Sequence, residues 1–144
     1  MEKNPPTVMI VGMIGYLWNT LGEGSAAVWR QVGHCFYDEI KESGGDVSTK
    51  ESSIDAIKNY FIETHKFADD IIVEENGDEI TMEIKGCALR PVTDHFGEQG
   101  IPRSPCPYAN AMLFALEKQS GEMYVYEKNE SEDASSCKAY IKKL

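Results

Sequence analysis

The sequence predicts an α+β fold, in which N-terminal helices pack on an antiparallel sheet in the order ααα-ββ-α-ββ. Apolar residues recur at helical spacing through the first half of the chain, and the period then changes to two. Two pairs of strand-like runs follow, separated by one more helix. Adjacent hairpins form an antiparallel sheet with one face for helices to cover. A chain of 144 residues suits one domain, so we expect a single domain over residues 1–144.

Three helices are expected before the first strand. The first begins near Pro5 and Pro6, which suit a helix N-terminus, and it continues to Thr20, just before the breaker LGEG. The second covers residues 26–43 and ends at a Gly-Gly pair. The third begins at residues 52–53. One face of it carries Ile54, Ile57, Phe61, His65 and Ala68.

Four strands and one helix are expected in the second half. Residues 71–75 and 79–85 form a hairpin around Asn76-Gly77, a strong turn signal. Apolar and polar residues alternate along 79–85, so one face of that strand is buried. After a loop over residues 86–106, a helix covers 107–119 and ends at Gly121. The last two strands, 122–127 and 137–142, are joined by the acidic segment NESEDASS.

The charge of the chain excludes some partners. The formal net charge is −10 and the isoelectric point is about 4.7. Such a field repels phosphate backbones and anionic membrane surfaces, so we expect neither nucleic acid nor a membrane as partner. The longest apolar run, residues 8–18, is too short to span a bilayer and lacks the flanks of an export signal. We therefore expect a cytoplasmic protein with reduced thiols.

Three of the four cysteines fall at the ends of predicted elements. Cys87 ends a strand, Cys106 opens a helix and Cys137 begins the final strand. Ends of this kind gather at one edge of an α+β layer, and zinc takes four nitrogen or sulfur ligands. His95, in the same loop as Cys87, is the candidate for the fourth ligand. The spacing matches no compact zinc motif, and no CxxC pair is present.

Catalysis and simple packing are the alternatives for these residues. Cys106 at a helix N-terminus, where the helix dipole lowers the pKa of a thiol, could pair with His95 as nucleophile and base. Asp94 could orient that ring. Cys35, within the second helix next to its apolar face, is expected to be a small core residue.

An apolar gap between the helices and a curved sheet is a common place for a small-molecule pocket. Aromatic and methionine side chains at helical spacing are candidates to line it, with core packing as the alternative. The candidate ligand-binding residues are Trp29, Phe36, Phe61, His65 and Met112.

The second half of the chain resembles the 4-vinyl-reductase domain, a hydrocarbon-binding family. The resemblance rests on Cys106-Pro107-Tyr108 opening a helix, on the strand end Glu127-Lys128-Asn129, and on Cys137-Lys138-Ala139-Tyr140-Ile141. The N-terminal LGEGSAAVWRQVG is similar to the family's helix–turn–helix entry. The resemblance covers about three quarters of the chain.

The resemblance implies an α+β fold shared with ligand-binding subunits of vesicle-tethering complexes and with haem-based gas sensors. It also implies a structural zinc held by Cys and His. Carried onto this sequence, the ligands would be Cys106 and Cys137, completed by Cys87 or His95. Asn129 stands where the family usually has a further cysteine. A second, weaker similarity is to thiazoline-carboxylate hydrolase-like proteins, and it would make the Cys/His pair catalytic.

We therefore expect the domain to bind a small, largely apolar molecule, as sensor or carrier, beside a cysteine-based metal site. The alternatives are a Cys106/His95 hydrolase of a small cyclic or thiol-derived substrate, and a non-catalytic assembly subunit. The first helix is apolar almost all round, which favours a homodimer.

Overall fold

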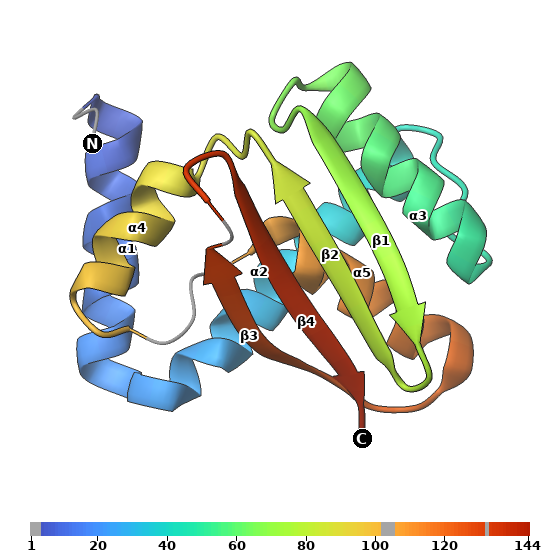
Figure 1. The fold of residues 1–144 in the computed structure, drawn as a ribbon. Helices are drawn as coiled ribbons and strands as arrows, with labels where there is room; N and C mark the ends of the chain where they lie inside the picture. The colour runs from blue at the N-terminus through green and yellow to red at the C-terminus, as the bar shows by residue number, and fades with distance from the viewer. Residues whose placement is uncertain (1–3, 102–105, 132) are drawn as a thin grey trace.

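The computed structural model describes residues 4–101, 106–131 and 133–144. Its centre is a four-stranded sheet in the order β1-β2-β4-β3, with every neighbouring pair antiparallel (Figure 1). The predicted α+β class and element order are confirmed. The strands are β1 (Asp70–Asn76), β2 (Glu79–Lys85), β3 (Tyr124–Ser131) and β4 (Ser136–Lys143).

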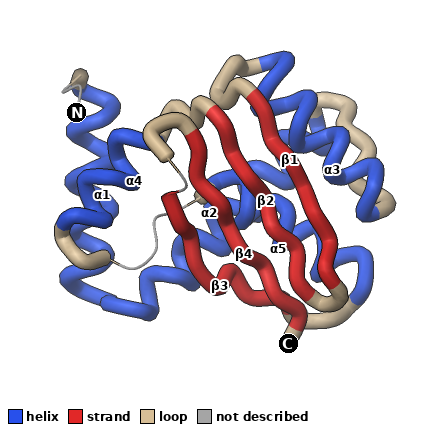
Figure 2. The backbone as a smooth tube through the Cα atoms, viewed as in Figure 1, coloured by secondary structure: helices blue, strands red, loops and turns tan. Residues whose placement is uncertain are grey.

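The helices divide into two groups around this sheet. In Figure 2, which shares the viewpoint of Figure 1, α2 and α5 lie behind the sheet, α3 lies at the β1 side, and α1 and α4 lie together beyond β3. The helical elements are α1 (Pro5–Leu21), η1 (Gly22–Gly24), α2 (Ser25–Glu42), α3 (Lys50–Lys58), η2 (Asn59–Thr64), α4 (Arg90–Glu98) and α5 (Pro107–Ser120).

The main core lies between the sheet and α5, with α2 on the outer side of α5. Ile80, Met82 and Ile84 alternate inward along β2, as the polar–apolar pattern predicts. Helix α2 crosses α5 closely because position 33 is a glycine. A Cβ atom there would lie 2.5 Å from the backbone carbon and oxygen of Asn110.

A smaller core joins α1 to α4. Ile14, Val92 and Phe96 form its buried centre. Helix α4 falls in the segment that we expected to be a loop. The signal for it is short: Pro91 suits the first turn of a helix, and Val92 and Phe96 are four residues apart, so both face Ile14.

Two other elements differ from their predicted bounds. The third helix changes after Lys58 into the π-type turn η2 and ends at Thr64, so His65 lies exposed beyond it. Strand β3 begins later and extends further than predicted. It also contains a bulge, since Tyr126 pairs with Ile141 whereas Lys128 pairs with Tyr140.

Within the described residues, no helix combines the length and apolar character that a bilayer crossing requires.

Candidate functional site: a three-cysteine cavity between two larger hollows

Three cysteines from distant parts of the chain line one small cavity. Cys87 follows β2, Cys106 is the N-cap of α5, and Cys137 lies near the start of β4. The ladder of β2 and β4 pairs Ile84 with Cys137, which brings the end of β2 to the start of β4. The cavity measures about 10 Å³, close to the smallest volume that holds one water molecule. We call it the cysteine cavity; the other lining residues are Leu89, Thr93, Pro107, Tyr108 and Asn129.

Burial dominates the electrostatics of these thiols. It raises the pKa of the Cys106 thiol far above its ordinary value, and the nearby Cys137 and Cys87 raise it further. The Cys106 sulfur accepts a hydrogen bond from the Ala109 amide at 3.5 Å, which lowers the pKa of the thiol, as expected at a helix N-terminus. The effect of burial is larger, so the pKa is raised overall. Burial also raises the pKa of Cys137 to about 11. All three thiols are therefore protonated at neutral pH, since the pKa of Cys87 is raised as well.

Tyr108 fixes one side of the cavity. Its hydroxyl donates to the Phe67 carbonyl oxygen at 3.2 Å and also lies within hydrogen-bond distance of the Cys87 sulfur, at 3.1 Å. The Leu89 amide donates to the same sulfur at 3.3 Å. Tyr108 is not among the predicted site residues. Its place two residues after Cys106, the cysteine predicted to open a helix, is the signal that the sequence offers.

The structure places His95 away from the cysteine cavity. Its ring lies on α4, with a centroid 5.0 Å from that of Phe96, and its Nε2 atom is 3.4 Å from the Gln99 amide nitrogen. His95 lines an open groove shared with Arg90, Asp94 and Glu98. Cys35 is exposed on α2. Among the described residues, no three His, Cys, Asp or Glu side chains already stand in a metal-binding arrangement.

An apolar hollow of about 250 Å³ lies on one side of the cysteine cavity. Helix α1 contributes one wall, and Trp29, Val32 and Phe36 of α2 contribute another. We call it the Trp29 hollow. All its lining residues are apolar: Ile10, Met13, Ile14, Trp29, Val32, Phe36, Phe67, Leu89 and Pro107.

Two of the five predicted ligand-binding residues, Trp29 and Phe36, line this hollow. Phe61 and Met112 lie in the main core, where Phe61 packs on Tyr108 with centroids 4.6 Å apart. His65 is exposed, and its ring packs on Tyr60 at 4.5 Å. The apolar spacing along one helix shows which side chains are buried. It does not show whether they pack against the sheet or against α1.

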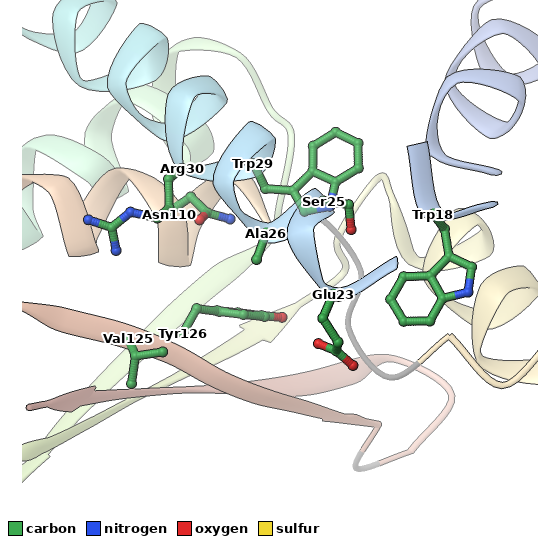
Figure 3. A pocket seen from close by; sticks show the side chains of 9 residues that line it. All are labelled: Trp18, Glu23, Ser25, Ala26, Trp29, Arg30, Asn110, Val125 and Tyr126. Atoms are coloured by element: carbon green, nitrogen blue, oxygen red, sulfur yellow. The ribbon is translucent and has the colours of Figure 1, made fainter. Parts of the chain in front are cut away.

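Trp29 also borders a second, smaller hollow, of about 60 Å³ (Figure 3). In Figure 3 the Trp29 and Ser25 side chains come from α2, Trp18 from α1 and Tyr126 from β3. Arg30 at its edge donates to the Tyr124 carbonyl oxygen and pairs with Glu117. This hollow is mixed in polarity and has room for a few water molecules.

Comparison with known proteins identifies the family. The family described as "Putative rubredoxin C-terminal domain" matches residues 7–144, nearly the whole chain, and the chain belongs to it. A relative called "Putative rubredoxin", from Methanothermobacter thermautotrophicus, is 30% identical over 130 residues. That match covers 90% of this chain and 68% of the relative.

Proposed function

We propose that this domain binds a small, largely apolar molecule in the Trp29 hollow, next to a metal site formed by Cys87, Cys106 and Cys137. The observation that carries this proposal is a shared wall. Leu89 and Pro107 line both the Trp29 hollow and the cysteine cavity. A guest in the hollow would therefore lie one side-chain layer from the thiols, and its binding would change their surroundings.

The size and lining of the hollow support an apolar guest. Ligand sites of drug-sized molecules measure roughly 300–1,000 Å³, and an apolar cavity of about 150 Å³ accepts benzene. A volume of about 250 Å³ therefore suits one or two fused rings or a short hydrocarbon. Burying apolar surface supplies about 25 cal/mol per Å², so such a guest needs few polar contacts.

The donor set of the cysteine cavity supports a soft metal. Three thiolates suit zinc or iron, and the name "rubredoxin" carried by the relative implies a metal, typically iron. A four-thiolate centre does not fit this domain, because the fourth cysteine, Cys35, is exposed on α2. The three sulfurs would have to turn toward a common centre. Because their pKa values are raised, metal binding would release protons.

The apolar site is tested by fluorescence. In a Trp18→Phe background Trp29 is the remaining tryptophan, and naphthalene should quench its emission saturably. Val32→Phe fills the hollow and should weaken the apparent affinity by at least about tenfold, through lost volume. The matched control is Val8→Phe, on the exposed face of α1. Equal quenching in both variants would contradict binding in the Trp29 hollow.

The metal site is tested with Co²⁺ in place of zinc or iron, on protein first treated with a chelator. We expect a sulfur-to-cobalt charge-transfer band that Cys87→Ser, Cys106→Ser and Cys137→Ser each abolish or strongly reduce. Cys35→Ser is the matched control and should retain the band. Absence of the band in the unaltered chain would overturn the metal site.

The geometry does not favour the hydrolase. A cysteine nucleophile needs a lowered pKa and a base within hydrogen-bond reach, whereas Cys106 has a raised pKa and His95 lies in another groove. The assembly role and the resemblance to the 4-vinyl-reductase domain stay predictions.

A further inference from the structure

A second, open groove meets the cysteine cavity at residues other than Leu89 and Pro107. It lies between α4 and β3 and measures about 430 Å³. We call it the α4–β3 groove. Thr93 and Asn129 line both this groove and the cysteine cavity, so these two side chains lie between the groove and the cavity.

The bulge in β3 is what puts Asn129 in this place. Between Tyr126 and Lys128 the strand carries one extra residue relative to β4. Beyond it, Asn129 rather than Lys128 pairs with the fully buried Ala139 and shares its face of the sheet. A regular strand would turn Lys128 toward the thiols. The bulge replaces a cation with a neutral amide, and Asn129 and Cys137 both line the cysteine cavity.

The α4–β3 groove is acidic. Asp94 and Glu98 lie one turn apart on α4 and both line it, beside the oxygen-bearing side chains of Thr93, Asn129 and Ser131. Arg90 pairs with Asp94, with Nε 2.8 Å from Oδ1, and its other nitrogens donate to the carbonyl oxygens of Asp133 and Ser136. Arg90 is thus turned toward the β3–β4 connection.

We propose that the α4–β3 groove is the route by which a hydrated divalent cation reaches Cys87, Cys106 and Cys137, with Thr93 and Asn129 as the passage. This inference rests on the proposed metal site. The Trp29 hollow cannot serve, because an ion would lose its hydration shell among apolar side chains. A groove lined by carboxylates raises the local concentration of cations and repels anions.

The first test is the rate of Co²⁺ uptake by the chelator-treated chain, followed by stopped-flow absorbance. Glu98→Gln should slow uptake by about two- to fivefold at low salt and lose part of the salt dependence. Glu127→Gln, on the exposed bulge of β3, is the matched control and should leave the rate unchanged. Asn129→Leu changes the passage and leaves the Cys137 thiol in place, and it should slow Co²⁺ uptake by at least about tenfold. Equal rates in all variants would overturn the route.

The second test needs no metal. Iodoacetamide and iodoacetate alkylate thiols alike, but only iodoacetate is an anion. The quantity to compare is the ratio of the alkylation rate with iodoacetamide to the rate with iodoacetate. In the Cys35→Ser variant, this ratio should be larger for the remaining thiols than for a small thiol at the same pH. Glu98→Gln should narrow that preference, and Asn129→Leu should slow both reagents. If neither variant changed these alkylation rates, the route would be overturned even if Co²⁺ binds. Failure of Co²⁺ binding with a preserved reagent preference would overturn the metal site but not the access path.

Discussion

The hydroxyl of Tyr108 lies 3.1 Å from the sulfur of Cys87 and donates to the carbonyl oxygen of Phe67 at 3.2 Å. One side chain at the start of α5 thereby ties the end of β2 to the segment after η2. Removing this hydroxyl should therefore change both the stability of the fold and the pKa of Cys87, and the two effects can be measured separately.

Tyr108→Phe should lower the free energy of unfolding by about 1 kcal/mol, because the Phe67 carbonyl loses one of its two donors in a part-buried place and keeps the Ala88 amide. Urea denaturation measures this. Tyr140→Phe is the control, since the Tyr140 hydroxyl makes an exposed hydrogen bond to Glu130.

Tyr108→Phe should also raise the pKa of Cys87 further, because the Tyr108 hydroxyl stabilises the thiolate and so lowers that pKa. Thiolate absorbance would show this, and an unchanged titration would contradict the contact.

The metal-free domain should lose stability in alkali. An unfolded cysteine ionises near its ordinary pKa of 9.0, whereas folded Cys137 has a pKa of about 11. The unfolded state therefore binds fewer protons over this window, and stability present below pH 9 declines as the pH rises. Cys137 contributes a loss on the order of 2 kcal/mol by pH 11.

The check is urea denaturation between pH 7 and 11 with chelator present. Cys137→Ser should flatten the profile, while Cys35→Ser should not. A profile that is flat in the unaltered chain would contradict the burial of these thiols.

Gly33→Ala should destabilise the fold by about 1 to 3 kcal/mol, because its new methyl would overlap the Asn110 backbone and push α2 off α5. Gly12→Ala is a matched control within a helix, since its added methyl meets nothing within 4 Å. There we expect no loss and a gain of up to about 1 kcal/mol from helix propensity. Thermal or urea unfolding distinguishes the two; equal effects would contradict the close crossing.

The homodimer stays a prediction, and the exposed face of α1 is where it should form. Met9, Met13 and Tyr16 are 66%, 57% and 69% exposed and share one face of the helix. Met9→Lys with Met13→Lys should convert a dimer to a monomer in light scattering. Met123→Lys, at a residue 63% exposed elsewhere, is the control. A monomeric unaltered chain would contradict the prediction.

Much of the fold was readable because it depends on local patterns. The alternation along β2, the Asn76-Gly77 turn and the glycine after α5 each report on neighbouring residues. Helix α4 was missed because it is short and its apolar pair faces α1, which lies far away in the sequence. The end of the third helix was missed because the change to a π-type turn leaves the apolar spacing almost unaltered.

The sequence by itself determined the α+β class, the element order and the placement of Cys87, Cys106 and Cys137 at element ends. Only the tertiary structure decided which side chains share a cavity. Strand pairing and the β3 bulge bring Asn129 beside Cys137, and the packing of α4 carries His95 into a different groove. Burial, which is a property of the whole fold, then overrides the effect of the helix N-terminus on Cys106.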